Sequence, residues 1–317
     1  MRRGGPPILP LDAAGVPPYA RVERGARGLR FAPLPAPEGA AAEPGAPLRA
    51  MAGAPAALRR AAVVADGALV LGVGAGVAYT LRAPAMQVIH DRRPPGLDRA
   101  AGAAGANAGL LHGADGWRMV VLPSLGDVAA DLGPGPVALR PDGRRLAVAL
   151  EGRVEEHDLP GDGPAAVHEG PADALAYLPD GTLLAAAGAA VGAPGAAPAA
   201  DGPPVVELHA AAAAPRAAAL HADGTVTVWE AGAAEPLGRW AAPPEARGSV
   251  ALSPDGALVA LGSPEGDAPV AVVVDARGGA PVRVVEGARA IAFGPEPGTL
   301  VVSGDWGCAW LSPPEEA

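Results

Sequence analysis

Short apolar runs separated by tight turns recur along the whole chain. In the clearest case, the apolar run 250–252 is followed by a Ser-Pro-Asp-Gly turn and a second apolar run at 257–260. Runs of this length around Asp-Gly are typical of β-hairpins, because Asp favours tight turns and Gly accepts a positive φ. The repeated turns contain Asp66-Gly67, Asp142-Gly143, Asp180-Gly181, Asp223-Gly224 and Asp255-Gly256. The sequence therefore predicts a repeat fold of small antiparallel sheets.

One complete repeat can be read early in the regular region. Apolar runs at residues 60–65, 68–73, 77–82 and 86–90 are joined by short Gly- and Pro-containing turns. Four consecutive antiparallel strands of this length form one blade of a β-propeller. The same order recurs with boundaries near residues 100, 135, 172, 205, 247 and 287. We therefore predict an all-β fold, a single β-propeller with seven four-stranded blades.

The last unit lacks an outer strand, and the N-terminal segment offers a replacement. A hairpin is predicted at residues 19–24 and 28–31. We expect a strand near Arg21 to Phe31 to close the last blade, because closure removes an exposed sheet edge. The chain then divides into an N-terminal segment with the closing strand and a Pro/Gly-rich loop (1–50), the propeller (51–312) and an acidic tail (313–317).

Two stretches depart from the repeat pattern. Residues 188–204 are rich in Gly, Ala and Pro without alternation, which predicts a flexible loop that replaces or interrupts outer strands. Residues 210–214 are all Ala and could form a short helix, although Pro215 would end it.

Composition and charge exclude several classes of partner. Of the 317 residues, 50% are hydrophobic and 18% are charged, as in a globular protein. A formal net charge of −10 is unsuited to nucleic acid, because phosphate binding needs clustered cations. Apolar segments of about 20 residues are absent, so no membrane span is expected. The first residues lack the apolar run of an export signal, and the single Cys308 is compatible with a cytoplasmic location.

One segment carries a family resemblance. Residues 223–230, Asp-Gly-Thr-Val-Thr-Val-Trp-Glu, resemble the third strand of WD40 repeats, with Trp-Glu in place of Trp-Asp. The Ser-Pro-Asp-Gly turn at 253–256 is similar to their first hairpin. No unit has the Gly-His pair of the standard repeat. The side-chain network that depends on this His in WD40 blades is therefore assigned to no position of this chain. The resemblance implies a WD40-like propeller that presents loops to partner proteins, a role without catalytic groups.

The densest group of possible metal ligands is found at residues 155–158. The candidates are Glu155, Glu156, His157 and Asp158, with His168, His209 and His221 further along the chain. Alternation along a strand sends Glu155 and His157 to one face and Glu156 and Asp158 to the other, which is typical of a charged outer strand. No Gly-x-Ser-x-Gly nucleophile motif is present. The repeated aspartates are interpreted as turn residues.

These observations favour a non-catalytic protein–protein interaction scaffold or regulatory propeller in a bacterial-type cytoplasm. We expect a monomeric propeller without catalytic residue, cofactor or metal, and a protein partner. Trp and Arg are frequent interface anchors, so the candidate partner contacts are Trp240, Trp306, Arg92, Arg93, Arg144 and Arg145. The other tryptophans are expected to pack between blades. The alternative is a propeller hydrolase or lactonase-type metalloenzyme with its site at the central channel.

Overall fold

Strands dominate the computed structural model of the protein, which describes residues 15–25, 28–54, 56–161, 163–195, 202–233, 235–263 and 266–314. Within these ranges it contains 29 strands and two single-turn 3-10 helices, η1 (Ala65–Gly67) and η2 (Pro244–Ala246). Neither helix has the length or the hydrophobicity that crossing a membrane requires. The all-β class predicted from the sequence is confirmed.

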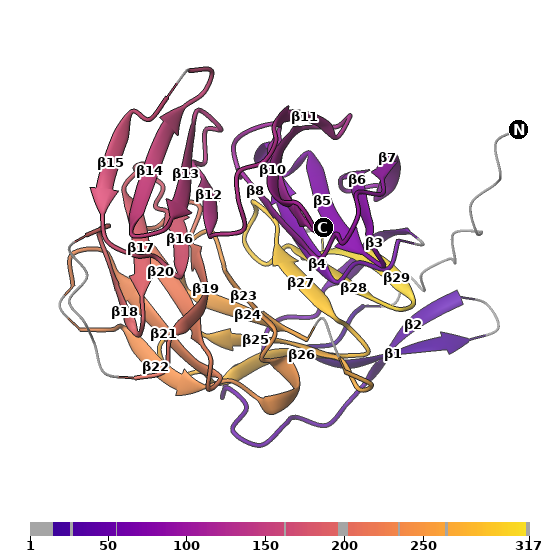
Figure 1. Ribbon diagram of the computed structural model, residues 1–317. Helices are drawn as coiled ribbons and strands as arrows, with labels where there is room; N and C mark the ends of the chain where they lie inside the picture. The colour runs from indigo at the N-terminus through magenta and orange to yellow at the C-terminus, as the bar shows by residue number, and fades with distance from the viewer. Residues whose placement is uncertain are drawn as a thin grey trace, which may run out of the picture.

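The strands form seven sheets arranged around a central axis (Figure 1), so the protein is a seven-bladed β-propeller. Blade 1 consists of β4 (Arg60–Val64), β5 (Leu69–Gly74), β6 (Val77–Arg82) and β7 (Gln87–Arg92). Blade 2 consists of β8 (Arg99–Gly102), β9 (Ala108–Gly113), β10 (Gly116–Val121) and β11 (Gly126–Ala129). Blade 3 consists of β12 (Val137–Leu139), β13 (Arg145–Leu150), β14 (Arg153–Asp158) and β15 (Ala166–Glu169).

The remaining blades follow in chain order. Blade 4 consists of β16 (Ala174–Tyr177), β17 (Leu183–Ala187) and β18 (Ala190–Gly192), and blade 5 of β19 (Val205–Ala210), β20 (Arg216–His221), β21 (Thr225–Glu230) and β22 (Gly238–Ala241). Blade 6 consists of β23 (Ser249–Leu252), β24 (Leu258–Gly262), β25 (Val270–Asp275) and β26 (Pro281–Glu286). Blade 7 contains β27 (Ala290–Phe293), β28 (Leu300–Gly304) and β29 (Gly307–Ser312). Each blade begins close to the boundary predicted from the sequence, which confirms the division into repeats.

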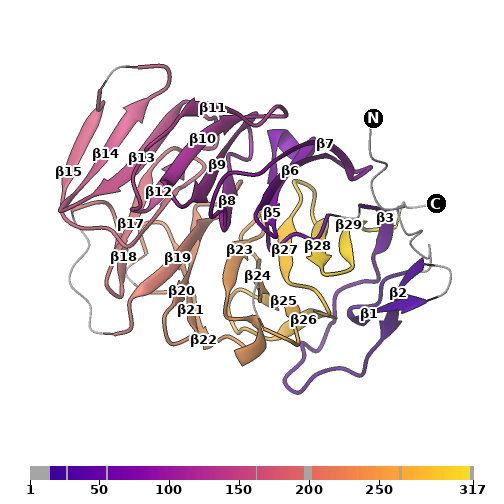
Figure 2. The ribbon, with the colours of Figure 1, turned by 45° about the vertical axis from the view of Figure 1, so that its right-hand side comes forward.

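An N-terminal strand closes the ring, but it is not the strand expected from the sequence. β3 (Arg49–Ala54) pairs antiparallel with β29 and becomes the outer strand of blade 7. The segment near Arg21 to Phe31 instead forms the predicted hairpin, β1 (Tyr19–Gly25) and β2 (Gly28–Pro33). β1 pairs in parallel with β26 at the outer edge of blade 6. Figure 2 shows β3 beside β29 and the hairpin beyond β26.

The prediction that the segment near Arg21 to Phe31 closes the last blade was wrong for a physical reason. The sequence of β3, Arg-Ala-Met-Ala-Gly-Ala, lacks the β-branched and aromatic residues that mark strands. Its pairing is fixed by the open edge of β29, which lies far away in the sequence. The hairpin has stronger local strand signals, but it covers a different edge.

Blade 4 departs from the four-strand pattern within the described ranges. The stretch 188–204 contributes the three-residue strand β18, and residues 196–201 of the predicted loop lie outside the described residues. The suggested helix at 210–214 does not form, because Ala210 ends β19 and an irregular connection leads on to β20.

Apolar side chains pack between neighbouring blades. Trp310 of blade 7 belongs to a buried cluster with Leu58 and Leu81 of blade 1. Trp117 of blade 2 packs with Leu146 of blade 3 in the same way. With few aromatic residues, the blades also approach closely at glycines: a Cβ at Gly102 would lie 2.1 Å from Val64 Cγ1. The prediction that these tryptophans fill space between blades is confirmed.

Candidate functional site

The innermost strands of the seven blades surround a central channel of about 1110 Å³. Much of its wall is alanine, including Ala61, Ala101, Ala138, Ala251 and Ala292. A methyl group is too small to fill the axis of the ring, so the channel stays open. Concave, largely apolar cavities with a few polar groups are the usual form of small-molecule sites.

The channel has an arginine mouth, where the innermost strands begin. We define it by Arg59, Arg60 and Arg99, which stand at or next to the first residues of β4 and β8. The carboxylates that line this mouth are Asp173 and Glu207, near the first residues of β16 and β19. Cations therefore outnumber anions by one among the charged side chains lining it, although the whole chain carries a net charge of −10.

An ion pair spans the arginine mouth. Arg60 Nη1 lies 3.1 Å from Glu207 Oε2. Arg60 belongs to blade 1 and Glu207 to blade 5, so the two side chains meet across the ring and not between neighbouring blades. Arg60 is thereby neutralised. Within the described ranges, neither Arg59 nor Arg99 has a side-chain hydrogen bond or ion pair, and both are exposed.

The opposite end of the channel is acidic. Asp66, Asp142 and Asp180 line it, together with Arg140. Arg140 donates to both carboxylate oxygens of Asp142, at 2.9 and 2.7 Å, and this ion pair lowers the pKa of Asp142. The Thr182 N–H donates to Asp180 Oδ1 at 2.8 Å and lowers its pKa too.

The repeated aspartates act as turn residues, as predicted. Asp142, Asp180, Asp223 and Asp255 each accept a backbone N–H from the residue two positions later. Four of the five Asp-Gly turns join the first two strands of a blade, but Asp223 lies between β20 and β21, at the opposite end of its blade. The five aspartates therefore do not form one ring.

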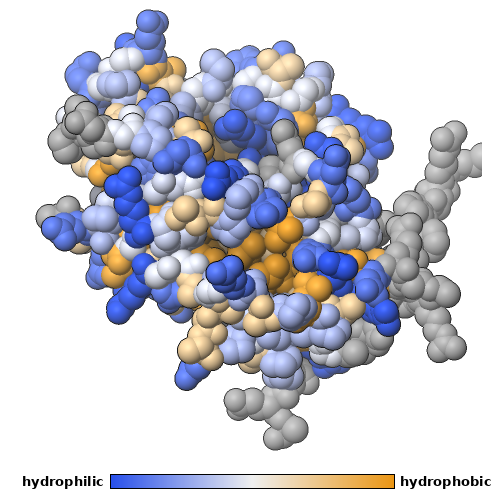
Figure 3. All heavy atoms as spheres, turned by 90° about the horizontal axis from the view of Figure 1, so that it is seen from below, coloured by the Kyte–Doolittle hydropathy of each residue, from blue (hydrophilic) through white to orange (hydrophobic). Residues whose placement is uncertain are grey.

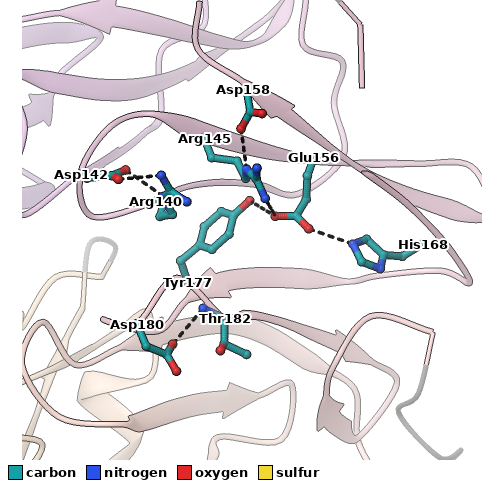
Figure 4. A network of polar contacts seen from close by, with 9 residues as sticks. All are labelled: Arg140, Asp142, Arg145, Glu156, Asp158, His168, Tyr177, Asp180 and Thr182. Atoms are coloured by element: carbon teal, nitrogen blue, oxygen red, sulfur yellow. Dashed lines mark hydrogen bonds and ion pairs between the residues drawn. The ribbon is translucent and has the colours of Figure 1, made fainter. Parts of the chain in front are cut away.

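Glu156 is the most buried carboxylate of the predicted ligand group, with 7% of its surface exposed. The Tyr177 hydroxyl donates to Glu156 Oε2 at 2.8 Å, and His168 Nε2 lies 2.9 Å from Oε1. Arg145 Nη1 lies 3.7 Å from the same carboxylate. Figure 4 shows Glu156 between Tyr177 and His168. Burial, and then the hydrogen bond to Glu156, raises the pKa of Tyr177.

This network joins two blades. Glu156 and His168 belong to β14 and β15 of blade 3, whereas Tyr177 belongs to β16, the innermost strand of blade 4. A buried carboxylate that accepts two or three hydrogen bonds is a satisfied structural group. The network therefore braces the interface between blades 3 and 4.

The other predicted ligands lie elsewhere. Glu155 and His157 share the second face of β14, with 3.3 Å between Oε2 and Nε2, which confirms the predicted alternation. His209 lines the channel, and its Nδ1 accepts the Leu252 N–H at 3.1 Å. His221 contacts Thr227 Oγ1 at 2.9 Å inside blade 5. Among the described residues, no group of three or more His, Cys, Asp or Glu side chains could hold a metal.

Two of the four candidate contact arginines are engaged between strands. Arg92 forms a bidentate ion pair with Asp127, at 2.6 and 2.7 Å, which links the outer strands of blades 1 and 2. Arg145 donates to Asp158 at 2.7 Å. Arg93 and Arg144 are exposed, and no side-chain bond is found for either within the described part of the chain. Of the four candidate arginines, these two have side chains available to a partner.

The two candidate tryptophans pack against neighbouring segments. Trp240 of β22 covers Gly279 of blade 6, where a Cβ would lie 2.5 Å from the indole ring. Trp306 Nε1 donates to the Gly287 carbonyl at 2.9 Å, and its ring meets Phe31 of the hairpin edge to face at 6.1 Å. Both side chains are partly buried. Partner contact by either residue stays a prediction.

Sequence reasoning missed an apolar outer rim on blades 1 to 3. Val88, Val128 and Val167 lie on the outer strands β7, β11 and β15, and the last two are 55% and 50% exposed. Val121 and Leu150, in the same blades, are exposed too. No local sequence signal distinguishes these valines from those that are buried, because exposure depends on which strand of a blade lies outermost. On the face seen from below, Figure 3 shows a further apolar area bordered by hydrophilic residues.

No known protein-family model matches this chain, and no curated protein sequence matches it either. The class of the protein is therefore defined by its fold, a seven-bladed β-propeller. The features on which a function can be argued are the apolar rim, the exposed arginines and the central channel.

Proposed function

We propose that this protein is a non-catalytic, WD40-like interaction propeller of the cytoplasm that binds a partner protein along the outer rim of blades 1 to 3. The observation that carries the proposal is the exposure of Val88, Val128 and Val167 on three consecutive outer strands. Apolar side chains exposed on the outer strands of neighbouring blades are candidates for contact with a partner.

The rim combines apolar contact with unpaired strand edges. Within the described ranges, β7, β11 and β15 are terminal strands of their sheets, whereas the hairpin covers the equivalent edge of blade 6. Burying the exposed parts of the three valines would contribute about 2–4 kcal/mol, since burying one whole valine side chain contributes about 1.5–3 kcal/mol. Arg93, which directly follows the outer strand β7 of blade 1, adds a charged group suited to carboxylates of the partner.

Blade 5 supports the likeness to WD40 repeats. Asp223 accepts hydrogen bonds from the Thr225 N–H at 2.8 Å and from its hydroxyl at 2.9 Å. His221 lies near the Trp229 ring, with 6.4 Å between ring centroids. These contacts tie the tight turn and the Trp-Glu strand into one braced hairpin.

The test is affinity capture with the full chain and two matched variants. Val128→Glu combined with Val167→Glu places charges on the rim, and Ala233→Glu places one on an exposed loop of blade 5. We expect the rim variant to lose the proteins that the wild type retains, because an unpaired charge is costly to bury at an interface. The loop variant should retain them. Equal capture by the wild type and the rim variant, with equal thermal unfolding, would refute the proposed surface.

A further inference from the structure

We infer that the arginine mouth of the central channel binds a small monocarboxylate with an apolar body, whose carboxylate is held by Arg59 and Arg99. This inference concerns the axis of the ring and is independent of the rim on which the proposed function rests.

The first observation is that these two guanidinium groups lack carboxylate partners within the described ranges, although carboxylates are nearby. Asp305 is close enough to Arg59 for the two charges to interact, but both its oxygens bind Arg289 at 2.8 Å. Asp98, next to Arg99, binds His112 Nδ1 at 2.7 Å. Asp305 and Asp98 are therefore committed to other groups, which leaves Asp173 as the further carboxylate that lines this mouth.

The second observation is the position of the two arginines. Arg59 precedes β4 and Arg99 begins β8, and these are the innermost strands of neighbouring blades. Both side chains line the same channel. A guanidinium group presents paired N–H donors that match the two oxygens of a carboxylate, so each of these arginines offers donors suited to a carboxylate that enters the mouth.

The third observation is the charge balance, which selects a monoanion. The cross-channel pair of Arg60 with Glu207 leaves Arg60 neutralised, and Asp173 offsets one further cation. One positive charge remains in excess among the lining side chains of this mouth. A carboxylate neutralises it, whereas a phosphate dianion would leave a negative charge beside Glu207.

The fourth observation concerns the rest of the ligand. Val206, adjacent to Glu207, is 49% exposed and lines the channel, and alanines line much of the remaining wall. The channel volume of about 1110 Å³ slightly exceeds the range of about 300–1,000 Å³ common for small-molecule sites. An apolar body would remove this exposed surface from water, so a carboxylate with an alkyl chain fits better than acetate.

The test is calorimetric titration of the full chain with octanoate, acetate and octyl phosphate. We expect octanoate to bind at least tenfold more tightly than acetate, and octyl phosphate to bind no more tightly than octanoate. Combining Arg59→Gln with Arg99→Gln should weaken octanoate binding at least tenfold. Val206→Glu should weaken it too, because it adds a negative charge at an exposed position of the apolar wall.

Arg82→Gln is the matched control, because Arg82 is an exposed arginine at the end of β6 that does not line the channel. It should bind octanoate like the wild type, and so should the rim variant with Val128→Glu and Val167→Glu. Thermal unfolding of each variant checks the fold. The inference is overturned if octanoate does not bind the wild type, if the double arginine variant binds it unchanged, or if acetate binds equally well.

Discussion

Arg283 holds the N-terminal segment on blade 6, and its replacement gives the sharpest test of the fold. The side chain belongs to β26 and is 5% exposed. Its guanidinium donates to the carbonyls of Ala46 at 2.5 Å and Pro17 at 3.3 Å. Within the described ranges it has no carboxylate partner, and burial lowers the pKa of its guanidinium to about 10. The charge is therefore compensated by backbone carbonyls alone.

Two opposing contributions determine how much stability the fold loses when Arg283 is replaced. Hydrogen bonds from a charged donor contribute about 1.5–3 kcal/mol each, so losing both costs about 3–6 kcal/mol. The lowered pKa corresponds to about 3 kcal/mol of charge desolvation, which a neutral side chain recovers. We therefore expect Arg283→Met to destabilise the fold by up to about 3 kcal/mol. Arg283→Ala should cost about 2 kcal/mol more, because the buried methylene groups are lost too.

Urea unfolding followed by circular dichroism measures these differences. Arg277→Ala is a suitable control, because Arg277 lies exposed in the same blade and only its backbone N–H is bonded, to Asp275. The control should stay within about 0.5 kcal/mol of the wild type. If Arg283→Ala is as stable as that control, the buried guanidinium does not hold the segment. If the Met and Ala variants are equally unstable, packing of the arginine stem contributes nothing.

Three further predictions follow from the same structure. Tyr177→Phe should destabilise the fold by about 1–3 kcal/mol in urea unfolding, because it leaves the buried Glu156 without its hydroxyl donor. The hydrogen bond from Arg92 lowers the pKa of Asp127 in the folded protein. The stability that this ion pair contributes is therefore fully present above the unfolded pKa of about 3.8, and it is lost as the pH falls through the lower folded value. Asp127→Asn should therefore flatten the dependence of stability on pH below about 4 in acid titrations. Deleting residues 1–54 should lower the melting temperature more than deleting residues 1–33, because only the longer deletion removes β3 and opens the ring.

Local signals account for the parts of the fold that could be predicted. Asp255 and its equivalents mark hairpins through bonds within a few residues, and these five turns occur one each in five of the blades. Blade boundaries could therefore be read from the sequence. The closing strand could not, because β3 is selected by the open edge of β29, a contact between distant parts of the chain.

The candidate sites were less accessible to sequence reasoning for a similar reason. The meeting of Arg60 and Glu207 depends on the curvature of the whole ring, since 147 positions separate them in the chain. Trp240 lies near a turn, which suggested exposure, but the facing residue on the next blade is Gly279, and the missing side chain there gives the indole a place to pack.

Alanine links the difficulty of reading this sequence to the shape of the molecule. Alanine has weak strand propensity, so the inner strands and β3 carry little signal. In the ring, the same residue lets neighbouring blades approach closely between their faces and leaves the axis open. Larger side chains at channel positions such as Ala251 or Ala292 would fill the central channel that Arg59 and Arg99 also line. Alanine therefore both weakens the strand signal in the sequence and leaves the channel open in the structure.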